Sequence, residues 1–245
     1  YTLNNYLVIK NTEKIRVSMS ARTIKIKMLS NYPILFDESK IENAENAHFT
    51  FGINLVKTLK MDGFRLKITS DHQIMIDATN ERSIRYAIRL LNDLIVQVNE
   101  DMYVPIVEIV DEPSLKIRGI IEGFYGTPWS VDNRLDVIAF MDKHRLNTFM
   151  YAPKDDLYHR NKWRELYPEE QLRELLLYKE MCEAKEIDFY YCISPGKDFD
   201  YANEQEFESL YQKLNQVIDE GIRNFALLMD DIDYKLSDKN KNLFI

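Results

Sequence analysis

"FALLMDDID", residues 225–233, places five apolar residues directly before a row of carboxylates. A short run that is apolar throughout is typical of a strand buried on both faces, as in a parallel sheet. In parallel α/β architectures the reactive groups gather at the carboxyl ends of the strands. Asp230 and Asp231 directly follow the run, so they form either a solvated turn or part of a site.

The residues before this stretch repeat the pattern of a strand followed by a helix. Three earlier apolar runs are predicted to be strands of the same sheet, at 116–123, 147–153 and 188–194. Helices are predicted between the strands, and they begin near Ser130, Glu169 and Asn203. This alternation predicts an α/β fold with a parallel sheet, either a (β/α)8 barrel or a doubly wound sheet.

The third predicted helix has an apolar stripe at helical spacing, which should face the sheet. The stripe consists of Phe207, Leu210, Tyr211, Leu214, Val217 and Ile218. Gly221 follows it and is expected to cap the helix, because glycine adopts the left-handed conformation of a helix end readily.

Residues 1–113 follow a different pattern, that of a small α+β domain. Strands are predicted where apolar and polar residues alternate, at 21–28, 64–69 and 73–78, with antiparallel pairing. A helix follows with one apolar stripe, formed by Ile84, Ala87, Ile88, Leu91, Leu94 and Ile95. Pro113 marks the boundary, since proline is excluded from central strands. Residues 1–113 contain no cluster of reactive side chains, so we expect a non-catalytic domain there and a second domain at 114–245.

Composition excludes several classes of function. The 245 residues carry a net charge of −8, so no general attraction to nucleic acid or anionic membranes is expected. No apolar run is long enough to span a bilayer. Cys182 and Cys192 lie in apolar stretches and are interpreted as buried thiols. The four histidines show no metal-binding spacing, neither phosphate-binding loop nor G-x-S-x-G elbow is present, and no cofactor is expected.

The strand ends carry the candidate site. Two adjacent carboxylates do not both ionise easily, so one of Asp230 and Asp231 should have a raised pKa, as a general acid requires. Aromatic residues nearby are candidates to line a sugar site, namely Phe124, Tyr125, Trp129 and Tyr151. The pattern is compatible with glycoside chemistry, and a metal site or a solvated turn stays open as an alternative.

Four motifs in this order resemble the catalytic domain of glycoside hydrolase family 84. They are "EGFYGTPW" (122–129), "YAPKDD" (151–156), "ISPG" (193–196) and "FALLMDDID" (225–233). The family comprises β-N-acetylglucosaminidases, including protein O-GlcNAcases and bacterial relatives often labelled hyaluronidases. The resemblance implies a TIM barrel at 114–245, preceded by the non-catalytic α+β domain of bacterial members.

The resemblance also implies a mechanism, in which the 2-acetamido oxygen of the substrate attacks C1 and the configuration is retained. Asp230 would hold the acetamido N–H, and Asp231 would act as general acid and then as general base. Lys154 would bind sugar hydroxyls, and Gly123 would bind them through its carbonyl oxygen. The implied partner is a glycan or glycoprotein that contains N-acetylglucosamine.

The strand count departs from a complete barrel, because only four of the eight expected strands precede residue 245. We therefore expect the first half of a barrel in a fragment of a longer chain, with unpaired edges that favour oligomers, and we leave open whether this chain alone is active. Two alternatives remain, a metal-dependent glycosyltransferase that uses Asp231 and Asp233, and a non-catalytic sugar-binding fragment. The compartment and the natural aglycone stay open, with a secreted or cell-surface bacterial protein favoured.

Overall fold

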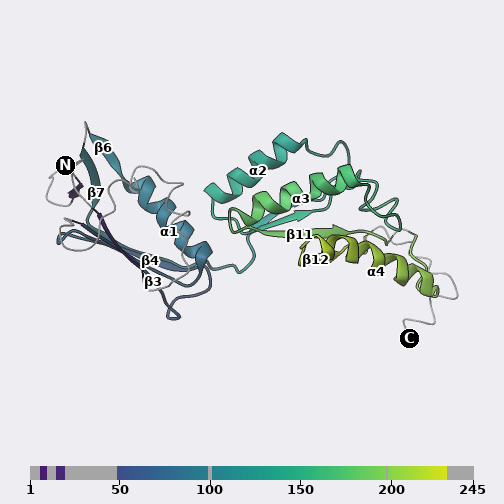
Figure 1. Ribbon diagram of the computed structural model, residues 1–245, viewed down its shortest axis with the longest axis horizontal. Coiled ribbons are helices and arrows are strands. Elements are labelled where there is room, and N and C mark those ends of the chain that lie inside the picture. The colour runs from purple at the N-terminus through teal and green to yellow at the C-terminus, as the bar shows by residue number, and fades with distance from the viewer. Residues whose placement is uncertain (1–5, 10–14, 20–48, 99–100, 197, 231–245) are drawn as a thin grey trace. The chain divides into compact units, whose positions relative to one another are not determined.

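The chain divides into two compact units, residues 1–116 and 117–245 (Figure 1). The structure, a computed structural model, describes residues 6–9, 15–19, 49–98, 101–196 and 198–230. The strand predicted at 21–28 lies outside the described residues, as do Asp231 and Asp233. No helix among the described residues is long and apolar enough to cross a membrane.

Unit 1 contains a mixed sheet of five strands in the order β2-β3-β5-β4-β8 and a second sheet in the order β1-β7-β6. The elements are β1 (Tyr6–Ile9), β2 (Ile15–Met19), β3 (Phe49–Leu55), β4 (Phe64–Thr69), β5 (Gln73–Ala78), α1 (Glu81–Leu94), β6 (Val96–Val98), β7 (Asp101–Pro105) and β8 (Val107–Asp111). The strands predicted at 64–69 and 73–78 are β4 and β5, an antiparallel pair. Strand β3, which was not among the predicted strands, pairs in parallel with both β2 and β5, so the sheet is mixed.

Helix α1 covers the five-stranded sheet with the predicted apolar stripe. Ile84, Ala87, Ile88 and Leu91 are fully buried, and Leu94 and Ile95 pack against them. The helix begins at a capping box, in which the Asn80 side chain accepts from the Ser83 amide at 2.9 Å. This reciprocal bonding satisfies amide groups that an α-helix leaves free at its first turn.

Unit 2 alternates strand and helix as predicted, which confirms the α/β class. Among the described residues, four parallel strands lie in the order β12-β11-β10-β9. The elements are β9 (Gly119–Glu122), α2 (Val131–Lys143), β10 (Thr148–Tyr151), α3 (Glu169–Glu183), β11 (Asp188–Ile193), α4 (Glu204–Asp219) and β12 (Asn224–Leu227). Helices α2 and α3 lie on one face of the sheet (Figure 1). The three helices share one core with the strands.

The close packing of β9 against β10 depends on Gly119. A Cβ atom at this position would lie 1.9 Å from the carbonyl oxygen of Thr148. Any side chain here would therefore push the two strands apart. The glycine allows the backbones to approach at the point where the parallel sheet begins.

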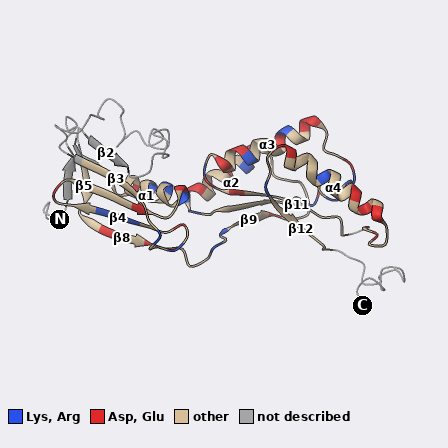
Figure 2. Cartoon of the chain, turned by 60° about the horizontal axis from the view of Figure 1, so that its bottom comes forward, with Lys and Arg blue, Asp and Glu red and all other residues tan. Residues whose placement is uncertain are grey.

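The predicted helix ends are confirmed by their caps. Ser130 caps α2 by accepting from the Asn133 amide at 3.2 Å. Asn203 caps α4, and Gly221 follows the last turn of α4 with a φ of +87°. Acidic residues stand in the first turn of α2, α3 and α4 (Figure 2), where they complement the positive end of the helix dipole.

The buried face of α4 differs from the predicted stripe. Phe207 and Tyr211 are 51% and 61% exposed, whereas Glu206, Lys213 and Val217 are buried. The reason is that the two buried charges have partners that lie elsewhere in the chain. Their partners are Arg164 for Glu206 and, for Lys213, the carbonyl oxygen of Glu165 with the rings of Tyr158 and Tyr167.

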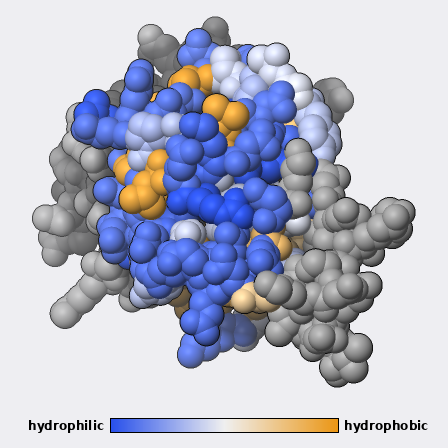
Figure 3. Space-filling view, turned by 90° about the vertical axis from the view of Figure 1, so that its right-hand side faces the viewer, coloured by the Kyte–Doolittle hydropathy of each residue, from blue (hydrophilic) through white to orange (hydrophobic). Residues whose placement is uncertain are grey.

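The surface of the molecule shown in Figure 3 is mostly hydrophilic, with a few separate apolar patches. This agrees with a chain in which 29% of the residues are charged. Most large apolar side chains are in the two cores instead.

A buried ion pair joins β9 to α2. The Arg134 guanidinium donates to both carboxylate oxygens of Glu122, at 2.7 and 2.9 Å. The two side chains are only 4% and 0% exposed. Arg134 also donates to Tyr178 at 2.7 Å, so the pair anchors the end of β9 to both neighbouring helices.

We expect Arg134→Met to lower the free energy of unfolding of unit 2 by about 3–5 kcal/mol, because it leaves the Glu122 carboxylate buried without its counter-charge. Arg173→Met is the matched control, since Arg173 and its partner Glu169 are 71% and 80% exposed and such pairs contribute about 0–1 kcal/mol. Denaturant titration of this chain, followed by tryptophan fluorescence, reports unit 2, which holds both tryptophans. Equal losses in the two variants would contradict a special role for the buried pair.

Candidate active site at the strand ends

Three of the predicted site residues and Ser194 follow the four parallel strands, one after each strand. Gly123 directly follows β9, Lys154 follows β10, Ser194 follows β11 and Asp230 follows β12. The Lys154 amide donates to the carbonyl oxygen of Phe124 at 3.2 Å, which joins the first two loops. The strand order alone therefore places residues from four separate segments at one edge of the sheet.

Asp230 is contacted from two of the other loops, those after β10 and β11. The Lys154 ammonium donates to its Oδ2, and the Ser194 hydroxyl donates to its Oδ1 at 3.0 Å. Lys154 is 7% exposed, whereas the Asp230 side chain is 41% exposed. A largely buried ammonium thus faces a carboxylate that stays open to solvent on another side.

The pKa of Asp230 follows from these contacts. Burial raises the pKa of the carboxyl group, but the hydrogen bonds from Lys154 and Ser194 outweigh burial and hold the pKa below its ordinary value. Asp230 is therefore ionised at neutral pH. The sequence predicts one raised pKa in the pair, and Asp230 is not the residue that carries it. Asp231, the other member, lies outside the described residues.

The loop that carries Gly123 is anchored by Glu122. Besides its ion pair, Glu122 accepts from the Trp129 amide at 3.0 Å, so it holds both ends of the loop 123–129. A Cβ atom at Gly123 would lie 3.3 Å from the Ile121 side chain, which is a tight contact. The structure thus places Gly123 directly after the end of β9.

The aromatic residues that were predicted to line one sugar site differ in exposure, although the rings of Phe124 and Trp129 lie 5.4 Å apart between centroids. Phe124 and Tyr125 are exposed in the loop after β9. Tyr151 is buried on the helix side of the sheet, where its hydroxyl donates to Asp156 at 2.8 Å. Alternate residues of a strand face opposite sides of a sheet, and through Asp156 the Tyr151 side chain supports the next loop.

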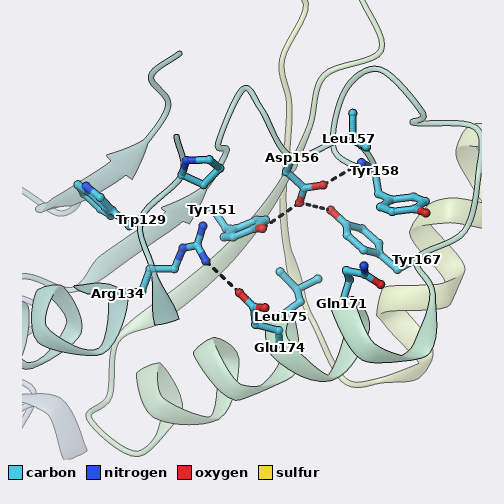
Figure 4. A pocket seen from close by; sticks show the side chains of 11 residues that line it. Trp129, Arg134, Tyr151, Asp156, Leu157, Tyr158, Tyr167, Gln171, Glu174 and Leu175 are labelled. Carbon is cyan, nitrogen blue, oxygen red and sulfur yellow. Dashed lines mark hydrogen bonds and ion pairs between the residues drawn. The ribbon is translucent and has the colours of Figure 1, made fainter. Parts of the chain in front are cut away.

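Trp129 and Tyr151 line a cavity of about 280 Å³ beside the strand ends (Figure 4). Asp156 accepts four hydrogen bonds at this cavity, two of them from the hydroxyls of Tyr151 and Tyr167 and two from the amides of Tyr158 and His159. All four donors lie in β10 or in the loop 152–168, so the carboxylate holds this loop together and to the end of β10. Its main effect is to hold the segment that carries Lys154.

Two residues at the site were not assigned a role from the sequence. Ser194 stands in "ISPG", and its place directly after a strand was a usable signal. His159 was set aside with the other histidines, yet it is fully buried and its Nδ1 lies 2.6 Å from the carbonyl oxygen of Cys192. No spacing rule indicates His159, because its partner is 33 residues away.

The described part of the chain contains no candidate metal site and no ionised thiol. No group of three or more histidine, cysteine, aspartate or glutamate side chains there is arranged to hold a metal ion. Cys182 and Cys192 are free and buried, as predicted. Burial raises the pKa of both thiols to about 12, so neither is a thiolate at neutral pH.

Comparison with known proteins identifies unit 2. Residues 118–243 match the family model of β-N-acetylglucosaminidases, named NAGidase. The chain is 44% identical over 126 residues to the proteins named O-GlcNAcase of Rattus norvegicus and Mus musculus. These matches cover 51% of this chain and 14% of each relative.

The whole chain also resembles a solved structure. CpGH84B superimposes with a TM-score of 0.82 at 30% identity, covering 98% of this chain and 44% of that chain. The likeness extends through both units, and it confirms the predicted fold class, an α+β unit followed by part of a TIM barrel. Since the family model covers half of the residues, the chain belongs to glycoside hydrolase family 84, the β-N-acetylglucosaminidases.

Proposed function

We propose that the protein containing this chain hydrolyses terminal β-linked N-acetylglucosamine with retention of configuration, using the substrate's own acetamido group as nucleophile. The observation that carries the proposal is the ionised Asp230, held by Lys154 and Ser194 at the strand ends of a family member. The two relatives named protein O-GlcNAcase favour sugar linked to protein as the substrate.

Asp230 has the properties needed to act on the acetamido group. Each carboxylate oxygen accepts about two hydrogen bonds, so after Lys154 and Ser194 are bound, each oxygen of Asp230 keeps an acceptor site. The acetamido N–H would donate to one of them. As the acetamido oxygen forms its bond to C1, positive charge develops on the acetamido group, and a fixed carboxylate stabilises that charge.

Asp231 is assigned the proton transfers. As the bond from C1 to the leaving oxygen breaks, Asp231 gives its proton to that oxygen, and the acetamido oxygen closes an oxazoline ring on C1. Asp231 then takes a proton from a water molecule that attacks C1, and the ring opens to restore the acetamido group. Two inversions at C1 give net retention. The ionised state of Asp230 leaves the acid role in the pair to Asp231.

Lys154 and Gly123 would bind the sugar itself. Lys154 has further N–H donors beyond the one directed at Asp230, and the Gly123 carbonyl group is an acceptor at the neighbouring strand end. Together they would orient the hydroxyl groups of the sugar ring, so that C1 lies beside Asp230 and Asp231. Such orientation contributes to rate by avoiding the entropy cost of assembly.

The test is turnover and inhibition by the full-length protein. We expect release of 4-nitrophenol from 4-nitrophenyl N-acetyl-β-glucosaminide. A thiazoline analogue of the cyclised intermediate should bind at least about a hundredfold more tightly than N-acetylglucosamine, because the site is complementary to that state. Equal affinity for the two compounds would exclude substrate assistance. Turnover that EDTA abolishes would instead favour the metal-dependent glycosyltransferase with Asp231 and Asp233.

A further inference from the structure

We infer that His159 is a positioning residue for this site, an inference that rests on the proposed function. Its neutral imidazole fastens the loop after β10 to the end of β11. This fastening sets the distance between Lys154 and Ser194, the two groups that donate to Asp230. His159 touches no reacting atom in this account, and it acts through its neighbours.

The contacts of His159 point to a single tautomer. Nδ1 lies 2.6 Å from the carbonyl oxygen of Cys192, and a carbonyl oxygen only accepts, so Nδ1 carries the proton. In the neutral ring Nε2 is then a bare acceptor. Nε2 is buried and has no hydrogen-bond partner among the described residues.

The backbone of His159 strengthens the same connection. Its carbonyl oxygen accepts from the Ser194 amide at 3.0 Å, and its own amide donates to Asp156 at 3.3 Å. His159 therefore contacts β11 at Cys192 and immediately beyond it at Ser194. Two hydrogen bonds of His159 hold together the loop that carries Lys154 and the strand end that carries Ser194. The ring donates one of them, and the backbone carbonyl oxygen accepts the other.

A neutral ring suits this position electrostatically. Burial lowers the pKa of His159, and the Lys154 charge lowers it further, whereas the contact with Cys192 and the charges of Asp156 and Asp230 raise it. The pKa lies below its ordinary value overall. A second positive charge next to Lys154 would compete for Asp230, so the neutral form maintains the arrangement of donors.

Two variants of the full-length protein separate the positioning contact from the bulk of the ring. The amide nitrogen of asparagine reaches the place of Nδ1, and that of glutamine reaches the place of Nε2. We expect His159→Asn to keep kcat within about tenfold, because the bond to Cys192 is restored. We expect His159→Gln to lose about a hundredfold in kcat with little change in KM, the size of effect that a small displacement of reacting groups produces.

The pKa of Asp230 provides a measurement that does not depend on turnover. In His159→Gln the carboxyl group should titrate at higher pH, because Lys154 and Ser194 no longer meet it together. In His159→Asn it should titrate as in the unaltered protein. Carbon-detected NMR of labelled aspartate measures this directly, and the acid limb of the kcat/KM profile should move in the same direction. His144→Asn is the control, because His144 is exposed at the end of α2.

The outcomes separate the two proposals. An unchanged Asp230 titration in both His159 variants, or an equal change in both, would overturn the positioning role. If circular dichroism shows that His159→Gln does not fold, the asparagine variant decides. An Asp230 pKa in His159→Asn equal to that of the unaltered protein supports the role, and a higher Asp230 pKa contradicts it. An inactive unaltered protein would reject the proposed function, and the NMR titration would still decide the role of His159.

Discussion

Asp231→Ala in the full-length protein is expected to slow the hydrolysis of substrates with poor leaving groups by about 10²–10⁴-fold, the usual contribution of general acid–base catalysis. The loss should be much smaller for 4-nitrophenyl substrates, because nitrophenolate leaves with little need of a proton. The measurement is kcat/KM across aryl N-acetyl-β-glucosaminides whose leaving groups span a range of pKa values. The slope of log kcat/KM against the leaving-group pKa should become steeper in the variant.

Asp155→Ala is a suitable control for this series. Asp155 is an exposed carboxylate of the same strand-end region, and its removal should leave the slope unchanged. A uniform loss across all leaving groups in Asp231→Ala would remove Asp231 from the acid role.

Asp230→Asn should depress the rate by about 10²–10³-fold for every leaving group, the range observed when one group that stabilises a developing charge is removed. Asparagine retains the shape but not the charge, and its amide nitrogen cannot accept from Lys154 or Ser194. The loss should be independent of the leaving group, because the proposed role concerns ring closure by the acetamido oxygen. The same aryl series measures it.

The pH dependence of kcat/KM is a second test of the role of Asp230. The pKa of this carboxyl group is lowered in the folded protein, so the ionised form and its contribution persist at neutral pH and are lost only as the pH falls through the lowered value. Removing the charge should therefore remove this part of the acid limb of kcat/KM. A loss that varies with the leaving group, with the acid limb unchanged, would instead assign Asp230 to proton transfer.

Much of unit 2 was readable from the sequence because its local signals agree. Continuous apolar runs predicted the strands, and Ser130, Asn203 and Gly221 correctly marked helix ends, since capping chemistry acts over a few residues. Parallel strands also bring their carboxyl ends to one edge, and Lys154 and Asp230, which the sequence placed at two of those ends, are hydrogen-bonded to each other. The four motifs then indicated the family.

In unit 1 the local signals predicted elements better than pairing. The periodicity of β4, β5 and α1 was clear, and each appears where it was predicted. Which strand lies beside which was not encoded locally, so the parallel pairing of β3 with β5 was missed. Alternation of apolar and polar residues shows which side chains share a face of the strand, but it does not show whether the neighbouring strand runs parallel or antiparallel.

The sequence by itself determined the order of strands and helices, the helix ends and the strand-end candidates of the site. Only the tertiary structure decided which polar side chains are buried and what they contact. Lys213 lies within an apolar core because its partners come from the loop after β10, and His159 in the same loop meets Cys192 in β11. The physical reason is that a buried polar group is tolerated only when a partner satisfies it. Such partners are far apart in sequence, and folding alone brings them together.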